Sequence, residues 1–159
     1  MAPHPQQGFF LIEALIAILI FALGVLGLVA LGGTAISSQS DAQYRTEASS
    51  LADAIVGEIQ LNVDRTTPLS LQTSLAAYAH NATTASNCVF SGSPTTNVSV
   101  LTLTNKAANV GGVGLPGAST GNQQILVDTV NFNRVEVTLC WKTASDTVLR
   151  RHTLVSYVN

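Results

Sequence analysis

Residues 8–31 read GFFLIEALIAILIFALGVLGLVAL, a stretch in which Glu13 is the only charged residue. The next charged residue along the chain is Asp41. As an α-helix, the 23 residues from Phe9 to Leu31 are about 34 Å long, which is enough to cross a hydrocarbon core of about 30 Å. The stretch therefore predicts a membrane-spanning helix over residues 9–33.

A cleaved secretory signal peptide is the alternative interpretation of such a stretch. Signal peptides have a positive start, an apolar core of roughly 7–15 residues and a small-residue cleavage site after that core. Here the residues before Gly8, MAPHPQQ, contain no Lys or Arg, and the apolar run is too long and contains a carboxylate. These departures favour a retained helix over cleavage after residues 33–35.

The composition of the whole chain also indicates that part of it lies outside water. The 159 residues are 47% hydrophobic and only 10% charged, whereas roughly a quarter of the residues in a typical soluble domain are charged. Seven Lys and Arg against nine Asp and Glu give a net charge of -2, so there is no basic surplus to bind a phosphate backbone. We therefore expect no nucleic-acid partner.

The hexapeptide GFFLIE at residues 8–13 resembles the cleavage and methylation motif of type IV prepilins. With the apolar stretch that follows, about the first 65 residues resemble minor pilins of the type IV pilus modification protein (PilV) family. The resemblance implies a leader peptide over residues 1–8, cleavage after Gly8 by prepilin peptidase, and N-methylation of Phe9. In that family the leader usually carries Lys or Arg, and Thr or Ser is common at the position of Phe10.

Glu13 is the second functional residue that the resemblance implies. Cleavage after Gly8 would leave a positive amine on Phe9, about one helical turn before Glu13. In the family, the carboxylate of one subunit neutralises the amine of its neighbour, which aligns the helices during assembly. Pairing of the amine with Glu13 of its own chain is one alternative. The other is a Glu13 near the end of the span whose side chain extends to the lipid headgroups.

The helical pattern continues beyond the apolar stretch in an amphipathic form. Apolar residues recur at three- and four-residue steps at Ala48, Leu51, Ala52, Ile55, Val56, Ile59 and Val63. We therefore predict one helix over residues 10–63, with an amphipathic half at 41–63. Pro68 is predicted to stop it, and a short helix is predicted over 69–78.

Strand-like runs fill the remainder of the chain. They cover 98–104, 125–130, 134–142 and 147–158, with a turn at 143–146, while 81–97 and 105–124 are rich in loop-forming residues. The predicted fold class is α+β and pilin-like, with the long N-terminal helix packed on a small antiparallel sheet within residues 98–158. Residues 34–159 would form a periplasmic domain.

Cys88 and Cys140 are the only cysteines, which is consistent with one disulfide in an oxidising compartment. Two unpaired thiols are the alternative. No second Cys or His lies at ligand spacing from either, so we expect no metal site, and we expect no cofactor. The three histidines, His4, His80 and His152, belong to no catalytic motif, so we expect no enzyme activity.

The leading hypothesis is a minor pilin anchored in the bacterial inner membrane. Its domain would be periplasmic before the subunit enters a pilus at the cell surface. Its partners would be other pilin and minor pilin subunits, prepilin peptidase and the inner-membrane pilus assembly machinery. Two alternatives are a type II secretion pseudopilin and a periplasmic enzyme or binding domain on an uncleaved single-span anchor.

Overall fold

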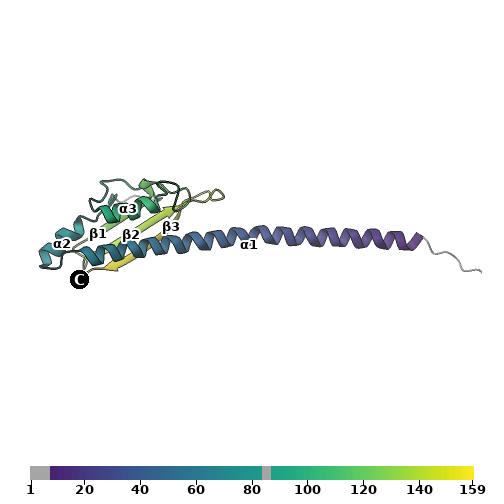
Figure 1. Ribbon diagram of the computed structural model, residues 1–159, viewed down its shortest axis with the longest axis horizontal. Coiled ribbons are helices and arrows are strands. Elements are labelled where there is room, and N and C mark those ends of the chain that lie inside the picture. The colour runs from purple at the N-terminus through teal and green to yellow at the C-terminus, as the bar shows by residue number, and fades with distance from the viewer. Residues whose placement is uncertain (1–7, 84–86) are drawn as a thin grey trace, which may run out of the picture. The chain divides into compact units, whose positions relative to one another are not determined.

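The computed structural model describes residues 8–83 and 87–159, so all of the predicted leader except Gly8 lies outside the described residues. The chain divides into two compact units, one ending at Ala42 and one covering Gln43–Asn159. The elements in chain order are α1 (Gly8–Asn62), α2 (Pro68–Ala76), α3 (Val98–Ala107), the 3₁₀ turn η1 (Thr120–Asn122), β1 (Gln123–Asp128), β2 (Arg134–Trp141) and β3 (Arg150–Tyr157) (Figure 1). The predicted α+β fold is confirmed.

The C-terminal part of α1 packs on the sheet, which runs alongside it in Figure 1. The predicted apolar stripe is buried, and each of its residues is at most 8% exposed: Ala48, Leu51, Ala52, Ile55, Val56, Ile59 and Val63. The Nε2 of Gln60 also donates to Ser156 Oγ of β3, at 2.9 Å. The amphipathic pattern therefore correctly predicted a helix, and the chain's own sheet covers its apolar face.

The sheet has the order β1-β2-β3, and both pairings are antiparallel. One face of the central strand belongs to the same core as α1, and its residues are at most 1% exposed: Val135, Val137, Leu139 and Trp141. Because side chains alternate along a strand, Glu136, Thr138 and Cys140 point to the opposite face, which we call the outer face. The disulfide lies on that outer face.

The strand predicted over 98–104 is wrong, because this segment is helix α3 and the sheet begins at Gln123. Asn97 caps the helix, with its Oδ1 accepting the N–H of Val100 at 3.0 Å. Val100, Thr104 and Ala107 are buried at helical spacing, none more than 1% exposed. Burial of this face together with the cap outweighs the strand preference of the β-branched residues.

Pro68 does not act as the predicted stop, because α1 ends at Asn62 and Pro68 is the first residue of α2. Thr67 and Ser70 form a capping box at the start of α2, in which Thr67 Oγ1 accepts the N–H of Ser70 at 3.0 Å. Proline suits the first helical position because its missing N–H would have no partner there. The predicted second helix is confirmed with earlier bounds.

The three later strands are confirmed with small shifts in their bounds. The turn between β2 and β3 is held by Asp146, whose carboxylate accepts the N–H of Thr143 at 2.9 Å and pairs with Arg150 at 2.7 Å. The segment predicted as a loop over 105–124 also contains the end of α3 and the η1 turn.

Candidate functional site

The N-terminal part of α1 is exposed along its whole apolar length. Every residue from 10 to 39 is exposed, and α1 is long and apolar enough to span a membrane. No residue of its most apolar 18-residue stretch is buried. An apolar surface of this extent needs lipid or other protein around it.

Glu13 lies on this exposed surface. The side chains beside it, Ile12, Ile16, Ala17 and Ile20, are apolar. Within the described part of the chain, no hydrogen bond or ion pair involves the Glu13 carboxylate. Because a lone carboxylate is costly to place in lipid, it needs a partner that the uncleaved chain does not supply.

The predicted cleavage position lies at the start of the same helix. α1 begins at Gly8, so the Gly8–Phe9 bond is in its first turn, and Glu13 follows Phe9 by four residues. Positions four apart are neighbours on one helix face. A new amine on Phe9 would therefore lie about one helical turn before the Glu13 carboxylate.

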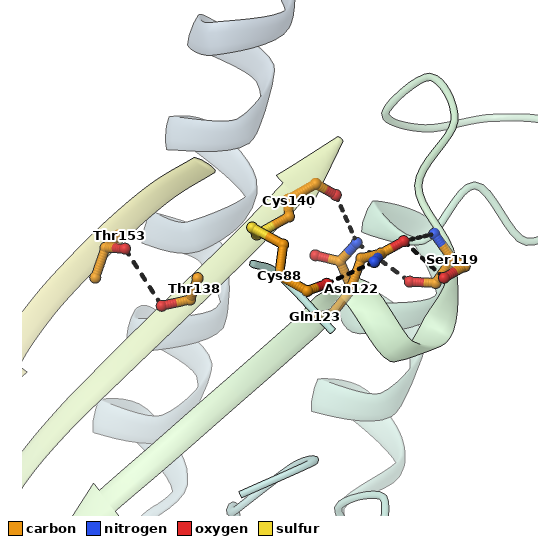
Figure 2. Close-up of a disulfide and its surroundings, with 7 residues drawn as sticks. All are labelled: Cys88, Ser119, Asn122, Gln123, Thr138, Cys140 and Thr153. Carbon is orange, nitrogen blue, oxygen red and sulfur yellow. Dashed lines mark hydrogen bonds between the residues drawn. A yellow bond between two sulfur atoms is a disulfide. The ribbon is translucent and has the colours of Figure 1, made fainter. Parts of the chain in front are cut away.

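The second predicted site, the disulfide, is present. Cys88 and Cys140 are joined with an S–S distance of 2.05 Å and a Cα–Cα distance of 6.0 Å, across a sequence separation of 52 (Figure 2). Both cysteines are buried, packed with Phe90 and half-buried Leu149. The bond attaches the loop that contains Cys88 to the outer face of β2.

Side-chain amides donate to the backbone carbonyl oxygens of both disulfide cysteines, as Figure 2 shows. The Nδ2 of Asn122 donates to the carbonyl oxygen of Cys88 at 2.6 Å, and its Oδ1 accepts the N–H of Ser119 at 2.9 Å. The Nε2 of Gln123 donates to the carbonyl oxygen of Cys140 at 3.2 Å. This network was not predicted, although three consecutive amides, Asn122, Gln123 and Gln124, were a visible signal.

The segment before Cys88 is held at the outer edge of β1. The backbones of His80 and Ile125 exchange two hydrogen bonds, of 3.1 and 2.9 Å. The Nε2 of Gln124 donates to the carbonyl oxygens of Asn81 and Thr83, at 2.9 and 3.1 Å. The residues from His80 to Thr83 therefore cover this edge of the sheet.

His80 is a buried structural histidine, only 3% exposed. The N–H of Thr95 donates to its Nδ1 at 3.2 Å, and burial lowers the pKa of the imidazole below its ordinary value. A neutral ring is therefore favoured. No group of three His, Cys, Asp or Glu residues close enough to hold a metal ion occurs within residues 8–83 and 87–159.

The predicted site residues thus fall into two places. Cys88 and Cys140 are brought together in the unit that starts at Gln43, whereas Gly8, Phe9 and Glu13 belong to the unit that ends at Ala42. The chain matches no protein-family model, no curated protein and no solved structure.

Proposed function

We propose that this chain is a minor type IV pilin, an assembly subunit that is cleaved after Gly8 and enters a pilus through its N-terminal helix. The observation that carries the proposal is the exposed apolar part of α1, in which Glu13 is the single charged residue and follows Phe9 by four positions. Before assembly, lipid of the inner membrane would cover this surface. In the filament, the helices of neighbouring subunits would cover it.

The pairing of charges gives this helix a defined register. Cleavage creates a cation at Phe9, and in a bundle of low dielectric each cation needs an anion close by. Glu13 of an adjacent subunit supplies that anion only when the two helices are correctly staggered. One carboxylate thereby selects among the axial positions that apolar contacts alone would leave equivalent.

Two further features support the proposal. A Cβ atom added at Gly24 or Gly27 would meet nothing within 4 Å, so no contact inside the chain requires these glycines. Small residues in membrane helices allow close approach of another helix. The sheet unit, closed by a disulfide, suits an oxidising periplasm.

Mass spectrometry of the mature N-terminus tests the proposal. We expect a chain that begins at Phe9 and is one methyl group heavier than its unmodified mass. Gly8→Val should leave the leader attached, because the peptidase needs a small residue at the bond that it cuts. Gly27→Val is the matched control and should be cut normally. A wild-type chain that keeps Met1 or its neighbour would instead identify a simple anchor.

Deletion of the gene separates the proposal from a type II secretion pseudopilin. Loss of surface pili and twitching motility is the expected result. Loss of secreted exoenzymes with normal pili would assign the subunit to secretion. Loss of neither, with an unprocessed N-terminus, would favour a periplasmic enzyme or binding domain on an anchor.

A further inference from the structure

The outer edge of β3 is an open strand edge. The N–H of Val158 donates to the carbonyl oxygen of Asn133 at 3.2 Å, and this contact continues the register in which Tyr157 pairs with Arg134. In an antiparallel ladder, hydrogen-bonded pairs alternate with pairs that are not hydrogen-bonded. Every second residue of β3 therefore directs its N–H and C=O away from β2: Arg151, Thr153, Val155 and Tyr157.

These four residues are also the exposed residues of the strand. Within residues 8–83 and 87–159, the sheet continues no further than β3 on this side. The opposite edge differs, because His80 already occupies it through its two backbone bonds with Ile125. Exposed edges with unpaired backbone groups are templates for a further strand.

A basic pocket lies on the outer face of the sheet, beside the N-terminal end of β3. It has a volume of about 940 Å³, with Cys88, Thr147 and Val148 in its lining together with Lys142 and Arg151. In the described residues, neither the Lys142 ammonium nor the Arg151 guanidinium has an acidic partner. Arg151 belongs both to the pocket and to the open edge, so the two features meet at this residue.

We propose that β3 accepts an extended segment of another polypeptide as a fourth strand, with an acidic residue of that segment in the pocket of Lys142 and Arg151. Backbone hydrogen bonds to the four outward residues would hold the strand. The pair of cations would fix its register by binding a carboxylate. This proposal goes beyond the proposed function and does not depend on cleavage or on assembly through α1.

The chemistry of the edge specifies the partner further. Beyond Arg151 the strand presents Thr153, Val155 and Tyr157, so a matching segment is uncharged and partly apolar after its acidic end. β3 reads RRHTLVSY and contains no acidic residue. The β3 strand of a second copy could therefore pair with the edge but could not fill the pocket, which favours a different segment as the occupant.

Peptide binding to the full chain tests this proposal. The probes are two labelled synthetic peptides of alternating Thr and Val, with two Glu residues at the amino end in one and at the carboxyl end in the other. The chain is held in detergent with its disulfide intact, and binding is followed by fluorescence anisotropy. We expect saturable binding of one orientation. Replacement of Glu by Lys should weaken the binding at least tenfold. N-methylation of alternate peptide amides should do the same for one of the two alternate sets, the set that faces β3.

Two variants locate the binding on the chain. Val155→Pro removes an outward N–H and takes no ladder bond from β2, so it should weaken binding at least tenfold. Arg151→Glu should do the same through the pocket. Lys106→Glu on α3 changes the net charge equally and is the matched control, so it should leave binding unchanged.

Amide hydrogen exchange of the unmodified chain tests the edge without any substitution. In the free chain, the amides of Arg151, Thr153, Val155 and Tyr157 should exchange faster than those of the residues between them, and the bound peptide should slow only this alternate set. The proposal is overturned if neither peptide binds, if Val155→Pro leaves the binding unchanged, or if N-methylation leaves it unchanged for both alternate sets of peptide amides. It is also overturned if the bound peptide protects both alternate sets of β3 amides equally. Protection that rises with protein concentration would assign the edge to a second copy and also overturn it.

Discussion

The side-chain amide of Asn122 donates to the carbonyl oxygen of Cys88 at 2.6 Å, and both residues are buried. The bond joins the turn before β1 to the loop that carries the disulfide, 34 residues earlier in the sequence. This loop therefore has a non-covalent attachment directly beside its covalent one. Its position on the outer face depends on both.

Asn122→Ala should lower the free energy of unfolding by about 1–3 kcal/mol, because the buried carbonyl of Cys88 loses its donor. Urea unfolding of the full chain in detergent measures the change. Asn105→Ala is the control, since the side chain of Asn105 is only partly buried, and it should change stability by no more than about 0.5 kcal/mol. Equal effects of the two substitutions would mean that the bond to Cys88 contributes nothing.

Replacing both cysteines, Cys88→Ser with Cys140→Ser, should cost about 4 kcal/mol, the value expected for a closed loop of this length. In the unmodified chain, a thiol reagent should label neither cysteine without reductant. Both should be labelled after reduction under denaturing conditions. Labelling of native, unreduced protein would contradict the bond.

The helical state of residues 98–107 predicts opposite effects for two nearby substitutions. Asn97→Ala removes the cap of α3 and should destabilise the chain by about 1 kcal/mol. Thr102 is exposed, so Thr102→Ala should be neutral or stabilise the chain by a few tenths of a kcal/mol through higher helix propensity. Destabilisation by Thr102→Ala, measured by urea unfolding, would instead favour a strand.

The lowered pKa of His80 predicts that stability decreases in acid. The ordinary pKa is 6.5, so below about pH 6.5 the unfolded chain binds a proton that the buried imidazole resists. The contribution of His80 is therefore fully present above that pH and is lost as the pH falls toward the lower, native pKa. His80→Gln should reduce the drop in the urea midpoint between pH 7.5 and pH 5. An unchanged drop would show that other groups cause it.

Glu13→Ala should separate processing from assembly. Cleavage after Gly8 should continue, and membrane insertion should be no worse, because removing a charge from the span makes insertion easier. Entry into the filament should fail, since the Phe9 amine of an adjacent subunit would have no counter-charge, at a cost of several kcal/mol.

The measurement for Glu13 compares the cleaved fraction with the fraction that copurifies with sheared pili. Normal incorporation of Glu13→Ala would mean that this side chain only extends to the lipid headgroups. Glu13→Gln is the matched variant, and its incorporation at the wild-type level would show that a hydrogen bond suffices where we expect a charge.

Several features could be predicted from the sequence by itself because each depends on a local pattern repeated over many residues. The apolar run after Gly8, the stripe from Ala48 to Val63 and the alternation in residues 134–142 predicted α1 and the central strand with nearly correct bounds. The distance from Phe9 to Glu13 along a helix is also a local property. Pairing of the two cysteines followed from their number and the expected compartment.

Only the tertiary structure decided the state of residues 98–107, the partners of Asn122 and Gln123, and the open edge of β3. The strand preference of β-branched residues spans only about 1 kcal/mol, so the cap at Asn97 and the burial of Val100 and Ala107 outweigh it. The amides bind backbone atoms far away in sequence, and no local pattern encodes such partners. Which edge of a sheet stays open depends on where a distant segment, here His80, comes to lie against it.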